Sequence, residues 1–256
     1  MTEAIDFDQV RRALGQGELF LEYLPLMRLD GSGCVGAEAL VRWRRGDQVV
    51  PPMDFIPVIE NTPMSGLLTY WVMDTVAAEL GAWLRTHDHV HLSINVPPEV
   101  LGRGCLAYAA QKNDLVQVRN RLVLEITERG APDRMGLQEI RMIAAENVLI
   151  ALDDMGLDDS NLLVLSRAPV DIIKIDKAVI DHITDPSMDG PLARLKSLIA
   201  ASDRPQVIAE GIEHPEQAQR LYAAGVQMGQ GFLYARPMPA TDFVAWHAKH
   251  GAAAPA

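Results

Sequence analysis

The sequence has 256 residues, 48% of them hydrophobic, and a formal net charge of -11 at pH 7. This length is close to the ~250 residues of a single (β/α)8 barrel, and the acidic charge argues against binding of polymeric nucleic acid, which favours basic surfaces. Cys34 and Cys105 are too few for a disulfide framework or a thiolate metal site, so we expect a cytoplasmic protein. The first residues show no signal-peptide pattern, and the longest apolar run, 66–84, contains Asp74 and Glu79, so we expect no membrane contact.

The predicted elements alternate between strands and helices after an initial hairpin. Residues 7–15 predict a helix, and residues 19–29 and 35–43 predict two strands joined by Asp30-Gly31-Ser32-Gly33, a turn typical of an antiparallel hairpin. Further helices are predicted at 51–60, 67–84, 135–146, 162–168, 192–201 and 215–224. Further strands are predicted at 90–95, 122–127, 148–153, 172–176, 207–212 and 231–235.

This alternation predicts an α/β fold, and within that class a (β/α)8 TIM-like barrel whose first hairpin is antiparallel. An open, doubly wound sheet is the alternative. We expect residues 1–18 to form an N-terminal helix that packs on the barrel, residues 19–250 to form the barrel domain, and residues 251–256 to form a disordered tail.

The stretch from Ile150 to Asp176 carries the strongest chemical signal. An apolar strand runs directly into Asp153 and Asp154. Because neighbouring residues on a strand point to opposite faces, both aspartates can serve one site only where the strand ends, and we expect Gly156 to allow the turn. The next strand carries Lys174, and a buried ammonium group is costly unless carboxylates surround it. The two aspartates and the lysine therefore predict one charged pocket.

Polar residues occur in or at the end of six of the predicted apolar strands. They are Glu38, Asn95, Glu125, the Asp153 and Asp154 pair, Lys174 and Glu210. Because the carboxyl ends of the strands form the active-site mouth of a parallel barrel, we expect these groups to converge there. Oxygen ligands from Asp, Glu and Asn suit Mg2+ or Mn2+, and the sequence has no Cys and His pattern typical of zinc sites.

Each of these residues also has a purely structural interpretation. The alternatives are a Glu38–Arg42 ion pair, an Asn95 helix cap, a turn at Asp153 and Asp154, a Lys174–Asp176 ion pair, an exposed loop at Glu210 and a hairpin tip at Gln230. They would have to hold independently at six or seven strand ends, so a shared site is the better interpretation. We interpret His87, His89 and His91 as surface residues rather than metal ligands.

Taken together, the motifs become recognisable as those of a known family. They are Glu38-Ala39-Leu40 with Arg42-Trp43, Ser93-Ile94-Asn95, Glu125-Ile126-Thr127-Glu128, Asp153-Asp154-Met155-Gly156, Lys174-Ile175-Asp176, Ala209-Glu210-Gly211-Ile212-Glu213 and Gln230-Gly231-Phe232. In their order and approximate spacing the sequence resembles the EAL-type cyclic di-GMP phosphodiesterases, from about Leu19 to Pro239. Each motif alone is weak, whereas seven in order are specific.

The resemblance implies a second-messenger hydrolase that converts cyclic di-GMP to linear pGpG by attack of a metal-bound hydroxide. It implies Mg2+ or Mn2+ in a two-metal site, where two cations about 3.5 to 4 Å apart can lower the pKa of a bridging water and neutralise phosphoryl oxygens. It implies cyclic di-GMP as the small-molecule ligand and leaves a homodimer open. It implies the metal ligands Glu38, Asn95, Glu125, Asp153 and Asp154. It implies further catalytic roles for Lys174, Asp154, Glu210 and Glu128, and substrate binding by Arg42, by Gln230 and at the position of Leu24.

Two regions depart from the family pattern. The family usually has a glutamine that helps to hold a guanine base where this sequence has Leu24. The loop after the two aspartates usually contains Gly and Ser residues, whereas residues 157–161 here are Leu-Asp-Asp-Ser-Asn. These departures keep a second hypothesis open, in which a weakly active or inactive EAL domain acts as a cyclic di-GMP receptor or a protein-interaction module. The intact ligand set favours the enzyme.

Overall fold

The structure is a computed structural model that describes residues 5–127, 134–157, 170–201 and 206–252. Its strands are β1 (Leu19–Arg28), β2 (Cys34–Arg45), β3 (Gln48–Val50), β4 (His91–Asn95), β5 (Leu122–Thr127), β6 (Leu149–Met155), β7 (Ile172–Ile175), β8 (Gln206–Ala209) and β9 (Met228–Gly229). Its α-helices are α1 (Phe7–Gln16), α2 (Pro52–Ile59), α3 (Pro63–Thr86), α4 (Cys105–Lys112), α5 (Arg134–Ala145), α7 (Lys177–Ile180), α8 (Asp189–Ala200), α9 (Pro215–Ala223) and α10 (Ala240–His250). Short 3-10 helices cover Pro98–Val100, Leu115–Arg121 and Pro186–Met188.

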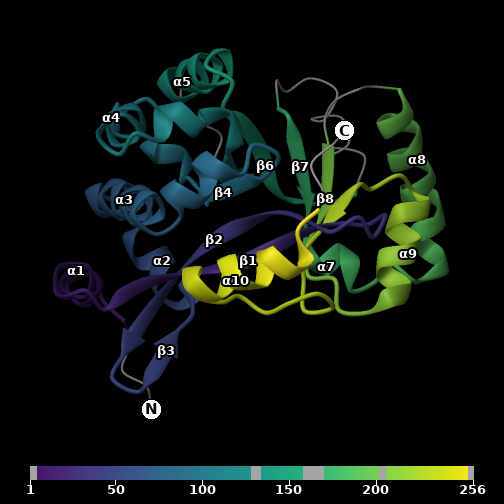
Figure 1. The fold of residues 1–256 in the computed structure, drawn as a ribbon, viewed down its shortest axis with the longest axis horizontal. Helices are drawn as coiled ribbons and strands as arrows, with labels where there is room; N and C mark the ends of the chain where they lie inside the picture. The colour runs from purple at the N-terminus through teal and green to yellow at the C-terminus, as the bar shows by residue number, and fades with distance from the viewer. Residues whose placement is uncertain (1–4, 128–133, 158–169, 202–205, 253–256) are drawn as a thin grey trace.

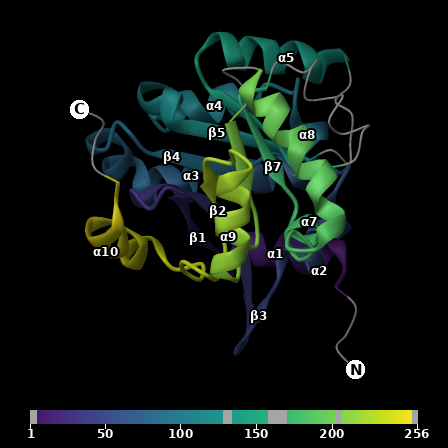
Figure 2. The ribbon, with the colours of Figure 1, turned by 90° about the vertical axis from the view of Figure 1, so that its right-hand side faces the viewer.

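The strands close into the predicted barrel. Strands β2, β4, β5, β6, β7, β8 and β9 are parallel neighbours in that order, and β1 closes the ring because it pairs antiparallel with both β9 and β2. The barrel and its antiparallel first hairpin are therefore confirmed, and the open sheet is excluded. Figure 1 shows α3, α4 and α5 on one side of the barrel and α8 and α9 on the other. Strand β3 extends the hairpin away from the barrel in both views (Figures 1 and 2).

The β1–β2 hairpin has a regular register over most of its length. Leu24 lies opposite Glu38, and Glu22 lies opposite Leu40. Because side chains alternate along a strand, Leu24 and Glu38 share the inner face of the barrel. Tyr23 points the other way, where it is fully buried and its hydroxyl donates to Glu79 of α3 at 2.7 Å. The hairpin thus joins the helical layer to the barrel interior.

Two predicted segments differ from the structure or lie outside it. The strand predicted at 231–235 is wrong: the last strand is β9, and the chain then turns, with Leu233 N–H donating to Ile212 and Tyr234 N–H to Gly231. Gly231 permits this turn because its backbone approaches Ile212 so closely that a Cβ atom would lie 2.3 Å from it. The helix predicted at 162–168 lies outside the described residues.

The C-terminal segment packs on the barrel through α10, which the sequence analysis did not predict. Helix α10 crosses β1 in Figure 1 and also contacts α3. Gly251 and Ala252 follow it, and the Ala252 N–H donates to the Cys34 carbonyl at 2.8 Å. The expected disordered tail is therefore wrong for these two residues, and residues 253–256 lie outside the described part of the chain.

At the N-terminal end, α1 contributes Val10 and Ala13 to the same hydrophobic cluster as Leu19 and Trp43 of the hairpin. The boundaries 1–18 and 19–250 remain predictions. None of the helices in the described ranges has the length and apolar character needed to cross a membrane.

A group of aromatic rings anchors α10 on α3. The indole of Trp83 lies 5.0 Å from the ring of His247, 5.0 Å from that of His87 and 5.2 Å from that of Phe243, measured between ring centroids. The predicted surface position of His87 is therefore only partly right, because its ring stacks on Trp83. His247 is buried, and its Nε2 atom has no hydrogen-bond partner among the described residues. Burial, together with the neighbouring His87 and His89, lowers the pKa of His247 to about 4.

This shift predicts acid sensitivity of the helix docking. The folded protein keeps His247 neutral down to about pH 4, whereas the unfolded chain binds a proton near pH 6.5, so stability is lost as the pH falls through that window. We expect wild-type protein to lose roughly 2 kcal/mol more unfolding free energy between pH 7.5 and pH 5 than His247→Phe, which cannot titrate. Urea unfolding at both pH values measures the difference, and equal losses in the two proteins contradict the prediction.

Candidate metal-dependent active site

Lys174 occupies the centre of a carboxylate cluster inside the barrel. Its side chain extends inward from β7, and the residue is 0% exposed. Its Nζ atom lies 2.6 Å from Glu210, 2.7 Å from Glu125, 3.2 Å from Glu38 and 3.3 Å from Asp153. These acids come from β2, β5, β6 and the segment after β8, so four separate parts of the barrel meet at one ammonium group. The predicted charged pocket is therefore present.

Two amide side chains complete the hydrogen bonding of this cluster. Asn95, the last residue of β4, donates from Nδ2 to Glu38 Oε1 at 2.9 Å. Gln230, directly after β9, donates from Nε2 to Glu38 Oε2 at 2.5 Å and to Glu210 Oε1 at 2.9 Å. Both amides thus orient buried carboxylates, and an unpaired buried carboxylate would carry a large desolvation cost.

A β-bulge brings both aspartates to the site. Between β6 and β7 the register advances from Leu152 to Met155 on one strand but only from Ile173 to Ile175 on the other. Asp153 and Asp154 together therefore lie opposite the one residue between those two isoleucines, which is Lys174. Asp154 adopts the left-handed conformation with φ of 58°, which aspartate tolerates better than most residues. The expected turn at Gly156 is wrong, because the bulge at Asp153 and Asp154 precedes that residue.

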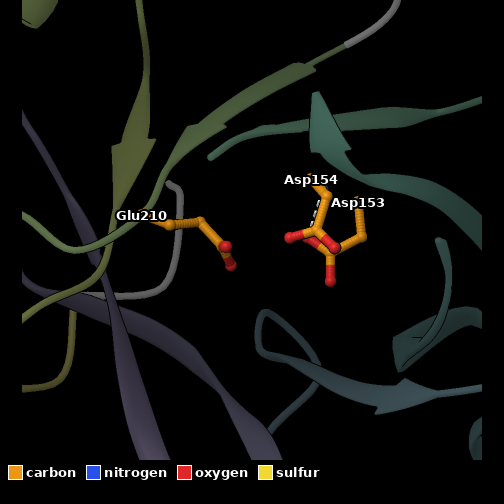
Figure 3. A group of neighbouring side chains, drawn as sticks. All are labelled: Asp153, Asp154 and Glu210. Atoms are coloured by element: carbon orange, nitrogen blue, oxygen red, sulfur yellow. Dashed lines mark hydrogen bonds between the residues drawn. The ribbon is translucent and has the colours of Figure 1, made fainter. Parts of the chain in front are cut away.

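The bulge places three carboxylates where they can share a cation. One oxygen each of Asp153, Asp154 and Glu210 lies within 4.8 Å of the other two. Figure 3 shows the side chains of Asp153 and Asp154 next to each other, with that of Glu210 extending toward them. The Asp154 N–H also donates to Asp153 Oδ1 at 3.0 Å, which fixes the orientation of that carboxylate.

The electrostatics at the centre of the cluster favour charged side chains. Burial acts to lower the pKa of Lys174, but the surrounding carboxylates outweigh it and raise that pKa well above its ordinary value. Burial alone would raise the pKa of Glu38, yet the Lys174 ammonium and the hydrogen bonds from Asn95 and Gln230 hold it below its ordinary value. Lys174 and Glu38 therefore form a charged pair in the barrel interior.

The other acids show that negative charge is in excess. Burial and the repulsion of neighbouring carboxylates raise the pKa of Glu125 well above its ordinary value and also raise that of Asp153. The same two causes raise the pKa of Glu210 to about 8. One ammonium group cannot neutralise five carboxylates, counting Glu38, Glu125, Asp153, Asp154 and Glu210. Hard oxygen donors with uncompensated charge are the setting that Mg2+ and Mn2+ prefer, so the residues fit such ions.

Arg42 lies further along β2, on the same face as Glu38 but four residues closer to the mouth. Its Nε donates to Glu22 of β1 at 2.9 Å, and its Nη1 donates to the Val41 carbonyl at 3.0 Å. Leu24, opposite Glu38, is half-buried. The mouth therefore presents a carboxylate cluster at its base and an arginine above it.

A family model described as EAL domain matches residues 8–237. The chain belongs to the EAL domain family. It is 32% identical to the probable cyclic di-GMP phosphodiesterase PdeB of Escherichia coli over 248 aligned residues. The aligned region covers 94% of this chain and 47% of that protein. The chain thus spans about half the length of this relative.

Solved structures of the same family have the same fold as this EAL domain. The PaMucR phosphodiesterase in complex with c-di-GMP superposes with a TM-score of 0.81 at 28% identity, over 92% of this chain and 98% of that chain. The EAL enzyme Bd1971 with cAMP and cyclic di-GMP bound superposes with a TM-score of 0.81 at 29% identity, over 93% of this chain and 67% of that one.

The EAL domain brings together most of the residues predicted from the sequence. The residues in the cluster are Glu38, Asn95, Glu125, Asp153, Asp154, Lys174, Glu210 and Gln230. Arg42 and Leu24 lie near it, on the hairpin that carries Glu38. Glu128 lies outside the described residues, as do residues 158–161 of the altered loop.

Two structural alternatives are wrong. Arg42 pairs with Glu22 and not with Glu38. Asp176 caps α7 by accepting the Ala178 N–H at 2.6 Å, so it is not the partner of Lys174.

Glu22 is the site residue that the sequence analysis missed. It is the only charged residue between Leu19 and Met27, a strand that is otherwise apolar apart from the Tyr23 hydroxyl. A lone carboxylate in an apolar strand requires a charged or hydrogen-bonding partner, so the sequence could have predicted that Glu22 forms an ion pair. The partner itself depends on the register of the hairpin, which the sequence does not specify.

Proposed function

We propose that this EAL domain hydrolyses cyclic di-GMP to linear pGpG, using Mg2+ or Mn2+ in a two-metal site. The observation that supports this most is the convergence of four carboxylates on one ammonium group at the mouth of the barrel, with a fifth carboxylate, that of Asp154, beside Asp153 and Glu210. The similarity to PdeB, a probable cyclic di-GMP phosphodiesterase, and to the PaMucR phosphodiesterase in complex with c-di-GMP supports the same activity and ligand. Water would add across one phosphodiester bond, leaving a 3′-hydroxyl on one guanosine and a 5′-phosphate on the other.

We propose a division of the acids between two cations. Glu38, Asn95, Glu125 and Asp153 would hold the first ion, and Asp153 and Asp154 would hold the second, with Glu210 in its water shell. Divalent ions bound there would lower the pKa of a coordinated water and neutralise phosphoryl oxygens. The proposed site of the second ion is supported by Asp153, Asp154 and Glu210, because one carboxylate oxygen of each lies within 4.8 Å of the other two.

The remaining residues position the acids and the substrate. Lys174 contacts four carboxylates at once, so we propose that it fixes their spacing and steadies the attacking water. Gln230 donates a hydrogen bond to each of Glu38 and Glu210 and so fixes the position of one carboxylate relative to the other. Arg42 would bind a substrate phosphate, because a guanidinium matches phosphate geometry. We also propose that Glu128 anchors the loop after the two aspartates.

The position of Leu24 affects base recognition. Leucine offers no hydrogen-bonding group, so it can contact a guanine only through apolar surface. A site that cannot hydrogen-bond a base discriminates less strongly against analogues that lack the bonding group. We therefore propose that this EAL domain discriminates less strongly between guanine and base analogues than relatives that have glutamine at this position.

The activity is tested by incubating purified protein with cyclic di-GMP and Mn2+ and separating the products by chromatography. We expect pGpG to accumulate, with no product after addition of EDTA or with Asp153→Asn. Binding of cyclic di-GMP without any pGpG would contradict hydrolysis and support a receptor instead.

A further inference from the structure

The arginine at the mouth is held by a carboxylate from the neighbouring strand. In the β1–β2 register, Phe20 lies opposite Arg42 and Glu22 lies opposite Leu40, so Glu22 is the diagonal neighbour of Arg42 on the same face. The Glu22 carboxylate accepts from Arg42 Nε at 2.9 Å. This contact connects the strand that carries Glu38 to the strand that carries Leu24, on the mouth side of the Leu24–Glu38 pair.

The contact divides the donors of the guanidinium into two groups. Arg42 Nε is used by Glu22 and one Nη1 proton by the Val41 carbonyl, while Nη2 has no partner among the described residues. A guanidinium presents its N–H groups in a rigid planar fork, so fixing one edge also fixes the direction of the other. The unused Nη donors are thus pre-oriented for an anion.

We propose that Glu22 is a positioning residue that holds Arg42 ready for a phosphate of the substrate. The inference rests on the proposed hydrolysis of cyclic di-GMP, because it assigns how one phosphate of that dianion is recognised. Glu22 would not touch the substrate. The phosphate would meet the Nη end of Arg42, since the Nε edge is already occupied.

The negative charge of Glu22 has an opposing effect, because it competes with phosphate for Arg42. Burial argues for positioning. The Arg42 side chain is only 15% exposed and that of Glu22 only 26%, so their attraction is screened less than that of an exposed pair. Without Glu22, a long arginine side chain would regain its rotamer freedom and turn its charged end toward water. Binding a phosphate would then require ordering that side chain again.

Kinetics of three variants test the proposal. We expect Glu22→Ala to raise KM for cyclic di-GMP about tenfold, with kcat changed less than about twofold, because ground-state ordering of Arg42 is lost. Glu22→Gln keeps an oxygen acceptor for Nε and should restore KM to near the wild-type value. Glu18→Gln is the matched control, since Glu18 accepts from Trp43 Nε1 at 2.9 Å on the same hairpin and does not contact Arg42.

A double-mutant cycle with Arg42→Ala provides a second test, and NMR of wild-type protein and Glu22→Gln provides one that does not need Glu22→Ala. If Glu22 acts only through Arg42, Glu22→Gln and Glu22→Ala should have no further effect on KM in the Arg42→Ala background. In addition, NMR of the ligand-free protein should show a slowly exchanging Arg42 Nε–H in wild-type protein and in Glu22→Gln.

The outcomes are separable. An unchanged KM in Glu22→Ala, with wild-type protein active, overturns the positioning role alone. A lower KM in both Glu22 variants shows competition and also overturns it. Wild-type protein that forms no pGpG overturns the proposed function, and this inference with it.

Discussion

Replacing Lys174 with methionine is expected to destabilise the metal-free protein by about 3 to 5 kcal/mol and to abolish hydrolysis, because a buried ion network then loses the cation at its centre. Four carboxylates lie within 3.3 Å of Lys174 Nζ, and no other ammonium or guanidinium group among the described residues contacts them. The measurement is urea unfolding in EDTA. The matched control is Lys177→Met, because Lys177 is 48% exposed and pairs with Asp181 and Glu213 at the surface.

The pH dependence of the Lys174→Met variant follows from the same acids. Burial and mutual repulsion already raise the pKa values of Glu125, Asp153 and Glu210, and loss of the ammonium raises them further. A carboxyl group whose pKa is raised in the folded state stabilises the fold below its unfolded pKa, and this contribution is lost as the pH rises. The destabilisation should therefore be smaller at pH 5 than at pH 8.

Metal should partly replace the lost ammonium. We expect Mn2+ to raise the melting temperature of Lys174→Met more than that of wild-type protein, because ligand binding stabilises the folded state and the variant has more uncompensated charge. If Mn2+ stabilises both proteins equally, or if Lys174→Met melts like Lys177→Met, the cluster is not the charged, cation-binding site that we describe.

Replacing Asp153 with asparagine is expected to lower turnover by at least about 1,000-fold and to remove Mn2+ binding, because the substitution takes one anionic ligand from both proposed cations. Asp153 lies 3.3 Å from Lys174 and accepts the Asp154 N–H at 3.0 Å, so an amide of the same shape can keep its place. Isothermal titration calorimetry with Mn2+ and the yield of pGpG are measured together. Asp181→Asn, a surface change, serves as the control.

Two substitutions of Asp154 distinguish its proposed role as a metal ligand from its role in the β-bulge. Asparagine tolerates the left-handed conformation that Asp154 adopts, whereas alanine is disfavoured there. Asp154→Asn should therefore lose Mn2+ affinity with little change in melting temperature, and Asp154→Ala should lose both. Full Mn2+ affinity in Asp154→Asn would rule out Asp154 as a ligand.

The acids of the site were predictable because their signal is local. An apolar strand that ends in Glu125 or Asp153 is unusual, and barrel geometry directs such strand ends to one mouth. Lys174 was predictable for the same reason, since a lysine amid isoleucines requires carboxylate partners. The order of the strands followed from the alternation of apolar segments.

The features that were not predicted depend on register and tertiary contact. The bulge at Asp154 arises from the pairing of β6 with β7, and no turn residue in the sequence marks it. The Glu22–Arg42 pair requires the diagonal offset of two antiparallel strands. Helix α10 and the ordered Gly251 are stabilised by contacts with Trp83 and Cys34, which are distant in the sequence. A pattern along the chain cannot encode such partners.

A crystal grown with Mn2+ and cyclic di-GMP, using anomalous scattering to locate the metal, tests the central claim most directly. We predict two anomalous peaks about 3.5 to 4 Å apart, each about 2 Å from carboxylate oxygens of the cluster. Asp153 should contact both ions, and a phosphate should lie at the Nη end of Arg42. The account is contradicted if no peak lies among Glu38, Glu125, Asp153 and Asp154, or if the ligand binds away from them.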